Sequence, residues 1–140
     1  MAIHSHKAVI LYGAAGAETV TFAGVMGITP PELAITSIEV TDLDSANFAK
    51  EFMAGLVDGG EASLELRFKK AEMTAMFALV RQEKSWKIRF NDGSTGSNGS
   101  TLVFLGFLTK IGPPKAELDK DVTASVSIKA TGLPVYTAGA

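Results

Sequence analysis

The chain has 140 residues, a formal net charge of −2 and no cysteine. This length suits one domain with a substantial core and is short for two, so we expect a single domain over 1–140. The near-neutral charge argues against a surface built to bind nucleic acid or anionic membranes, and the lack of cysteine excludes disulfides and thiolate chemistry. The start of the chain has no signal-peptide pattern, and no apolar run approaches a membrane helix in length. We therefore expect a protein made in the cytoplasm, without membrane insertion.

Alternation of apolar and polar residues with period two recurs along the chain. It is weak at 7–12, 18–23 and 33–40, and clear at 61–68, 85–90 and 121–130. Such alternation is typical of antiparallel strands with one face on a core and one face in water. The run 101–109 is apolar on both faces and predicts a strand covered on both sides. The sequence thus predicts a mainly β protein of about seven strands.

One segment has helical periodicity instead. Residues 70–82 place Met73, Met76, Phe77 and Val80 at helical spacing, with no glycine or proline between them. We expect one amphipathic helix lying across the sheet. The expected core comprises Leu64, Leu66, Phe68, Met76, Phe77, Trp86, Ile88, Val126 and Ile128.

Polar residues in the chain do not match a known catalytic or metal-binding pattern. The two histidines, His4 and His6, are too few for a zinc site of the usual kind. The acidic residues of 41–60 lack the spacing of a calcium-binding loop. The glycine-rich segment 91–100 lacks the lysine of a phosphate-binding loop and is expected to be a flexible loop, whereas 112–121 is expected to be a charged loop stiffened by proline. We expect no metal, no cofactor and no enzymatic activity.

The segment 41–60 combines the length of a loop with an apolar composition. Two interpretations remain open. One is a short helix from Ser45 to Leu56 packed on the core. The other is a surface that contacts another subunit, because long loops are often functional and apolar loop surfaces often mark protein interfaces. The apolar residues concerned are Phe48, Phe52, Met53, Leu56 and Val57.

The run 35–68 resembles the tail tube proteins of long-tailed bacteriophages. The residues that carry the resemblance are Val40, Thr41, Asp44, Ser45, Glu51, Phe52, Gly55, Leu56, Asp58, Gly59, Gly60 and Glu61. The C-terminal runs "FLGFLTKIGP" and "LDKDVTASVSIKATG" also fit the family, and the expected helix lies where the family has its single helix. The resemblance covers about 20–133. It leaves out an N-terminal segment, 1–19, of open role and an expected C-terminal tail, 134–140.

This resemblance implies a β-sandwich or partly rolled β-barrel with one flanking helix. It implies hexameric rings that stack into a tube in the virion tail, assembled in the host cytoplasm. The implied partners are other copies of the chain, the tape measure protein, tail terminator and tail-tip or baseplate proteins, and double-stranded DNA in transit.

The resemblance also suggests which residues act in assembly. Those expected at the interface between rings or subunits are Asp44, Phe48, Glu51, Phe52, Met53, Leu56 and Asp58. Those expected to face the lumen are Glu39, Glu61, Glu65, Thr123, Ser125 and Ser127. We expect a mildly negative, hydroxyl-rich wall, since a basic wall would hold DNA phosphates.

Three other functions are alternatives to a phage tail tube. The first is the inner tube of a contractile injection or type VI secretion-like system, which sequence hardly separates from a phage tube. The second is a small-ligand-binding β-barrel, which needs an apolar cavity. The third is an enzyme on a β-sandwich, which needs convergent polar residues.

Overall fold

The computed structural model describes residues 8–22, 24–90, 99–116, 118 and 122–139. This part of the chain contains nine strands, one α-helix and one short 3-10 turn. In chain order the elements are β1 (Val9–Ala14), β2 (Ala17–Thr21), β3 (Val25–Thr29), β4 (Ala34–Glu39), η1 (Ala46–Phe48), β5 (Phe52–Asp58), β6 (Glu61–Arg67), α1 (Lys70–Ala78), β7 (Lys84–Arg89), β8 (Thr101–Lys115) and β9 (Thr123–Thr137).

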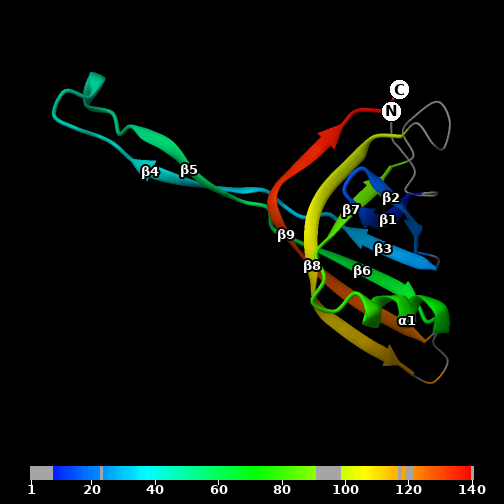
Figure 1. The fold of residues 1–140 in the computed structure, drawn as a ribbon. Coiled ribbons are helices and arrows are strands. Elements are labelled where there is room, and N and C mark those ends of the chain that lie inside the picture. The colour runs from blue at the N-terminus through cyan, green and yellow to red at the C-terminus, as the bar shows by residue number, and fades with distance from the viewer. Residues whose placement is uncertain (1–7, 23, 91–98, 117, 119–121, 140) are drawn as a thin grey trace, which may run out of the picture.

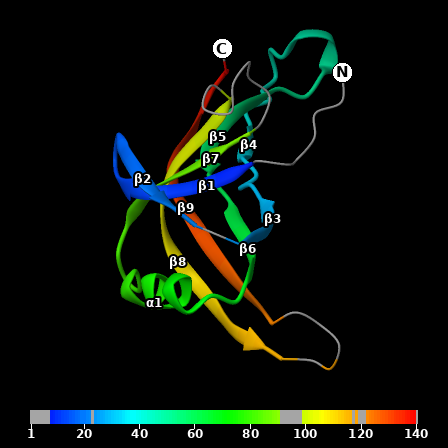
Figure 2. The same cartoon turned by 90° about the vertical axis from the view of Figure 1, so that its right-hand side faces the viewer.

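Seven strands form one antiparallel sheet in the order β2-β1-β7-β8-β9-β6-β3, and β4 pairs with β5 in a separate two-stranded sheet. Within the large sheet, β8 and β9 are the longest strands, and both are strongly curved (Figures 1 and 2). Register shifts between β8 and β9 accompany this curvature, as β-bulges do in bent sheets. The predicted fold class is confirmed: the chain is mainly β, with a seven-stranded antiparallel sheet and one flanking helix.

A single hydrophobic core joins strands from both ends of the large sheet. Ile10 of β1 and Leu64 of β6 belong to the same buried cluster, although three strands, β7, β8 and β9, lie between β1 and β6 in the sheet order. The sheet is therefore partly rolled around this core. Helix α1 closes it with Met76, and Leu79 follows directly after the helix; both side chains are buried.

Most of the expected core is confirmed. Seven of the nine expected residues are buried, namely Leu64, Leu66, Met76, Trp86, Ile88, Val126 and Ile128. The prediction of burial is wrong for Phe68 and Phe77, because 43% of the Phe68 surface and 58% of the Phe77 surface is exposed. Phe68 lies just beyond β6, and Phe77 is on the side of α1 that faces away from the sheet. The helix also ends at Ala78, and it could not run on to 82, because Arg81 takes a positive φ of 65°, outside the helical region.

Other segments differ from the expected elements. The helix expected from Ser45 to Leu56 is wrong, because most of this segment is extended backbone and its C-terminal half belongs to β5. Strand β3 was not predicted. Strand β8 runs on into the expected loop 112–121, and β9 continues to Thr137, into the expected tail. Residues 91–98, and also His4 and His6, lie outside the described residues.

A buried carboxylate fixes the edge of the sheet at β2. Glu18 accepts hydrogen bonds from the Ser85 hydroxyl and from the backbone N–H of Gly16, and its Oε2 lies 3.5 Å from Nζ of Lys87. Its side chain is only 2% exposed. Burial raises the pKa of Glu18, but these hydrogen bonds and the Lys87 charge lower it by more, so the net shift is downward.

Replacing Glu18 by glutamine is expected to destabilise the subunit at neutral pH by about 1–3 kcal/mol, the usual cost of losing a buried charged hydrogen-bond acceptor. The pKa of Glu18 is lower in the folded than in the unfolded chain. Its stabilisation is therefore complete above the ordinary value of 4.5 and is lost as pH falls through the folded pKa. Urea denaturation at pH 7 and pH 3 should show a smaller loss of stability on acidification in Glu18→Gln than in the wild type. Equal losses in both proteins would contradict this role, and Glu65→Gln, at an exposed site, serves as the control.

Candidate assembly surfaces

Strands β4 and β5 form an arm that extends away from the rest of the subunit (Figures 1 and 2). Within the part of the chain that the structure describes they pair only with each other, from Ala34 opposite Asp58 to Glu39 opposite Phe52. A two-stranded hairpin alone in water is at best marginally stable. No other described strand adds to this two-stranded sheet.

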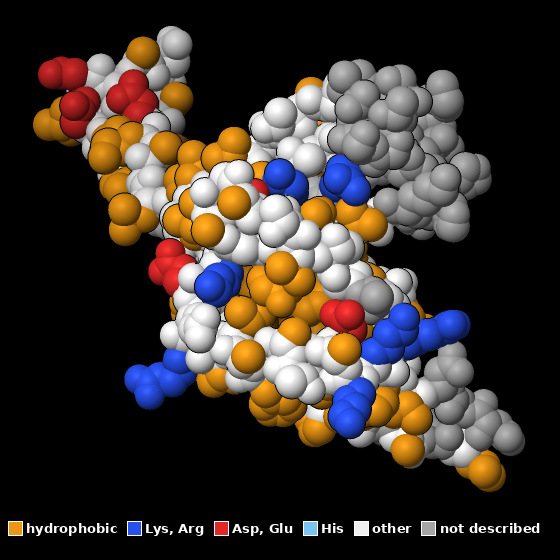
Figure 3. All heavy atoms as spheres, turned by 45° about the vertical axis from the view of Figure 1, so that its right-hand side comes forward, with side chains coloured by type: hydrophobic (Ala, Val, Ile, Leu, Met, Phe, Trp, Pro, Cys, Tyr) orange, Lys and Arg blue, Asp and Glu red, His pale blue; other side chains and the backbone are white. Residues whose placement is uncertain are grey.

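Both faces of the arm carry exposed apolar side chains. Ile38 and Met53 lie opposite each other on one face, whereas Ile35 and Val57 are paired on the other. Phe52 is 58% exposed and Leu56 is 86% exposed. Figure 3 shows hydrophobic side chains along the arm and acidic side chains at its far end. Strands that are apolar on both faces are normally covered on both sides.

Polar residues of the recognised motif shape the tip of the arm. The hydroxyl of Thr41 accepts a hydrogen bond from the N–H of Glu51 at 2.7 Å, which closes the loop across ten residues. Ser45 accepts from the N–H of Asp42, and Asp42 in turn accepts from the N–H of Asp44. These bonds explain the short polar side chains at this tip, because such side chains accept hydrogen bonds from backbone N–H groups in turns. Phe48 is fully exposed on this tip.

The sequence Asp58-Gly59-Gly60 joins the arm to the large sheet. Asp58 accepts hydrogen bonds from the N–H of Gly60 at 3.0 Å and from Lys129 Nζ at 2.9 Å. These two contacts, in that order, hold the pKa of the Asp58 carboxyl below its usual value. Gly60 has a φ of +80°, and a Cβ there would collide with the backbone of Glu32; a Cβ at Gly59 would lie 2.7 Å from the carbonyl oxygen of Gly132. The two glycines thus allow the close backbone crossing from which the arm leaves.

The structure therefore places all seven expected interface residues on the arm. Asp44, Phe48 and Glu51 form part of the tip, while Phe52, Met53 and Leu56 lie along β5. Asp58 is at the base.

A second surface lies on the face of the sheet opposite α1. Glu65 lies opposite Ser125, and Arg67 lies opposite Thr123, across the β6–β9 pair. Because Leu64, Leu66, Val126 and Ile128 of the same strands are buried beneath the helix, the alternating residues face the other way. The residues of this polar face on β6 and β9 are Glu61, Ser63, Glu65, Arg67, Thr123, Ser125, Ser127 and Lys129.

Five of the six expected lumen residues meet on this polar face, namely Glu61, Glu65, Thr123, Ser125 and Ser127. Glu39 does not join them, because it lies on β4 in the arm, in a different sheet. The hydroxyl of Thr109 on β8 donates to Glu61 Oε1 at 2.9 Å and extends the polar face to a third strand. Sequence reasoning missed Thr109 because the run 101–109 reads as apolar on both faces.

The expected mildly negative charge of this face is wrong. Besides Glu61 and Glu65 it carries Arg67 from β6 and Lys129 from β9, and Lys110 of β8 lies opposite Ser127. Asp58 offsets Lys129 by its ion pair. The acidic and basic groups are therefore balanced, and the described part of this face is mixed in charge.

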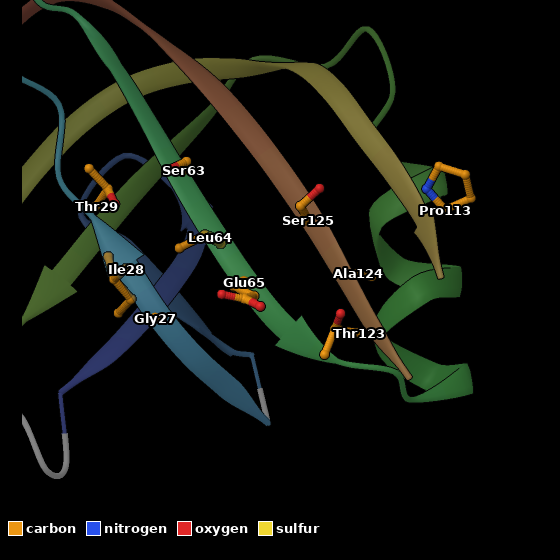
Figure 4. Close-up of a pocket in the computed structure, with 10 residues that line it drawn as sticks. All are labelled: Gly27, Ile28, Thr29, Ser63, Leu64, Glu65, Pro113, Thr123, Ala124 and Ser125. Atoms are coloured by element: carbon orange, nitrogen blue, oxygen red, sulfur yellow. The ribbon is translucent and has the colours of Figure 1, made fainter. Parts of the chain in front are cut away.

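An open depression of about 560 Å³ crosses the polar face (Figure 4). Its lining comes from β3, β6, β9 and the end of β8 and comprises Gly27, Ile28, Thr29, Ser63, Leu64, Glu65, Pro113, Thr123, Ala124 and Ser125. The depression is open to solvent, and its lining mixes polar and apolar residues. Among the described residues, no group of three or more His, Cys, Asp or Glu is placed to hold a metal ion. Nor does any described helix have the length and hydropathy to cross a membrane.

The fold resembles that of chains in solved structures of a gene transfer agent tail and of contractile injection assemblies. At 17% identity and a TM-score of 0.72, the chain resembles a chain in the tail of an empty gene transfer agent particle, with 98% of this chain and 100% of that chain covered. It also resembles a chain in the sheath/tube terminator of PVC, an extracellular contractile injection system, at 11% identity and a TM-score of 0.75, covering 99% and 98%. A chain in the tube-terminating cap of the anti-feeding prophage matches at 11% identity and a TM-score of 0.77, covering 99% and 93%.

The sequence itself gives the family. Residues 12–137 match the family model described as lambda phage tail tube protein. The chain belongs to the lambda phage tail tube protein family, which confirms the predicted family, the structural role in a tail and the location in the virion tail. Comparison with curated proteins found no match.

Proposed function

We propose that the chain forms rings that stack into the tail tube, and that the arm of each subunit bridges adjacent rings. The observation that carries this proposal is the arm itself, a two-stranded sheet with exposed apolar residues on both faces. Burial of such a surface against other copies of the chain would give stacking a large favourable free energy, since buried apolar area contributes roughly 25 cal/mol per Å².

Free strand edges support a ring in which the sheets of neighbouring subunits join. Strand β3 is at one edge of the large sheet. At the other side, β7 pairs with β8 only over 101–106, so the rest of β8 has no described strand on that side. The four strands from one edge to the other, β8-β9-β6-β3, alternate in direction. Strand β3 of one subunit would therefore meet β8 of the next in antiparallel orientation. Pro113 and Pro114 lack an N–H and would limit this joint to the part of β8 before them.

Closing the ring in this way would turn the polar face toward a central channel, because α1 covers the opposite face. Its hydroxyls and balanced charges suit a hydrated wall along which DNA passes without being held. The five residues proposed to face the lumen are Glu61, Glu65, Thr123, Ser125 and Ser127.

The remaining partners are proposed from the similar structures. The gene transfer agent tail is described with C6 symmetry, which supports hexameric rings. Similar chains occur in a tube terminator, a tube-terminating cap and a baseplate, which supports contacts with proteins of these kinds at the ends of the tube. The tube would enclose a tape measure protein and later conduct double-stranded DNA. The role proposed is structural and not enzymatic.

A second candidate is the inner tube of a contractile injection system. It is favoured by the similarity to a chain of the PVC sheath-tube complex, with a TM-score of 0.73. Both candidates require rings that stack. Purified protein should therefore form rings or tubes in negative-stain micrographs, with sedimentation shifting to larger species as concentration rises. A monomer that persists at high concentration under all assembly conditions would contradict both.

Replacing Ser125 and Ser127 by lysine is expected to leave tube formation intact but to slow DNA ejection strongly at low salt. Each subunit would add two positive charges to the channel wall, and DNA binding through phosphates weakens steeply as salt rises. Ejection from virions that carry the variant should therefore recover at high salt. The matched control is Thr74→Lys on α1, outside the proposed channel. Unchanged ejection at low salt, with intact tubes, would place these serines outside the lumen.

A further inference from the structure

The two central strands of the large sheet carry a second exposed apolar surface, on β8 and β9. Leu105, Phe107 and Val135 are 42%, 38% and 57% exposed. By strand pairing they lie on the same side of the sheet as the polar face, since Phe107 is opposite Lys129 and Leu105 is opposite Thr131. We call these three residues the acceptor patch.

Along this side, β8 and β9 thus change from polar to apolar halfway. Register shifts between Val103 and Leu105, and between Leu108 and Lys110, fall at this change. Such irregularities bend a strand, and both strands are visibly curved (Figure 2). The apolar half therefore points in a different direction from the polar half, so a channel wall made by one need not include the other.

We propose that the acceptor patch receives the arm of a subunit from the adjacent ring. The inference rests on the proposed function and specifies which surface of the second copy covers the arm. Each of the two surfaces is apolar, exposed and without a partner among the described residues of its own subunit, and every copy supplies both. One face of the arm would pack on the patch, leaving the other face for a further neighbour.

Charge complementarity supports this occupant. The tip of the arm has three exposed carboxylates, from Asp42, Asp44 and Glu51, against one cation, Lys50. On β7, next to the patch, Lys87 lies opposite Val103 and Arg89 lies opposite Thr101, on the same side of the sheet. A third of the Lys87 side chain is exposed despite its contact with Glu18.

The dimensions of the arm are compatible with this arrangement. Leu56 lies five positions after Glu51 in the sequence, which is roughly 17 Å of extended strand. Crossing from β9 over β8 to β7 takes only about 10 Å, because neighbouring strands are about 4.8 Å apart. An arm that lies across these strands with its apolar part on Val135 and Leu105 would therefore bring its acidic tip to Lys87.

Cysteine cross-linking tests the contact in a chain that has no natural cysteine. Two double variants place one cysteine in the patch, Leu105→Cys, and the other on either face of the arm, Phe52→Cys or Met53→Cys. With a short bis-maleimide, assembled tubes should give covalent ladders for at least one of these pairs. Yields should exceed those of the control pair Met53→Cys and Phe77→Cys by about tenfold, since tethered groups within reach have a high effective concentration.

A zero-length carbodiimide cross-link tests the charged part in the wild-type protein. Asp58 and Lys129 are 2.9 Å apart within one subunit, so their cross-link should appear in monomers and tubes alike and acts as the internal control. Cross-links from the tip acids to Lys87 should appear only in tubes. The inference would be overturned if tubes show the control cross-link but the arm cross-links only to the cysteine that replaces Phe77 or to lysines of α1. The proposed function would still stand in that case. Failure of the wild type to form any tubes would refute both.

Discussion

Replacing Phe52 by aspartate is expected to abolish tubes while leaving the subunit folded. Phe52 is 58% exposed on an arm that is separate from the hydrophobic core, so the isolated subunit should lose no more than about 0.5 kcal/mol, as is usual at exposed sites. In an apolar interface the same charge would be buried without a partner, which costs several kcal/mol for each subunit. Circular dichroism should match the wild type, and negative-stain micrographs should show no tubes. Leu56→Asp should behave in the same way.

The control for this prediction is Phe77→Asp on the exposed side of α1. Phe77 and Phe52 have the same exposed fraction, 58%, so the two variants make the same chemical change at equally exposed sites. Phe77→Asp should still form tubes if α1 faces outward. Unfolding of Phe52→Asp would mean that the arm supports the core, and tubes from Phe52→Asp would remove the arm from the interface.

Replacing Leu66 by alanine is expected to destabilise the folded subunit by about 2–5 kcal/mol. Leu66 is 1% exposed in the centre of β6, between Ala124 of β9 and Val25 of β3, and the substitution would leave a cavity that rigid strands cannot fill. Urea denaturation should be measured at a concentration where sedimentation shows only monomer, because assembly itself stabilises the folded state.

Leu56→Ala is the matched control for this substitution, since it removes the same atoms from a leucine that is 86% exposed. It should change the stability of the monomer by no more than about 0.5 kcal/mol. A loss below about 1 kcal/mol for Leu66→Ala would show that β6 is not central to the core.

The sequence predicted the elements that bury one face within the subunit. Strands β6 and β9 alternate strictly, because Leu64 and Val126 meet the core while Glu65 and Ser125 meet solvent. The same reasoning explains which elements the sequence pattern did not predict. Strand β5 shows no alternation, since neither of its faces rests on the subunit core, and the periodicity of buried and exposed positions is therefore absent from its sequence.

Three other misses have local causes. Strand β3 is short and interrupted by Gly27, so too few residues carry its pattern. Strand β8 continues through Pro113, which a strand tolerates only where no neighbour needs its N–H. In α1, helical spacing singled out Phe77 along with Met76; Met76 is buried, but the second buried side chain is Leu79, just beyond the helix.

The polar face was predictable in position but not in charge. Alternation in two strands was enough to place Glu61, Glu65 and the serines together. Lys129 follows from the alternation of β9 itself, whereas the position of Lys110 depends on how β8 pairs with β9, where register shifts decide which residues face the same way. That pairing is a property of the folded sheet and cannot be read from either strand alone.

A cryo-electron microscopy reconstruction of tubes assembled from the pure protein tests the central claim most directly. We expect stacked rings in which each arm is buried against the adjacent ring, and a channel lined by Glu61, Glu65, Thr123, Ser125 and Ser127. Rings whose arms make no contact with an adjacent ring, or in which these five residues face the outside of the tube, would contradict it.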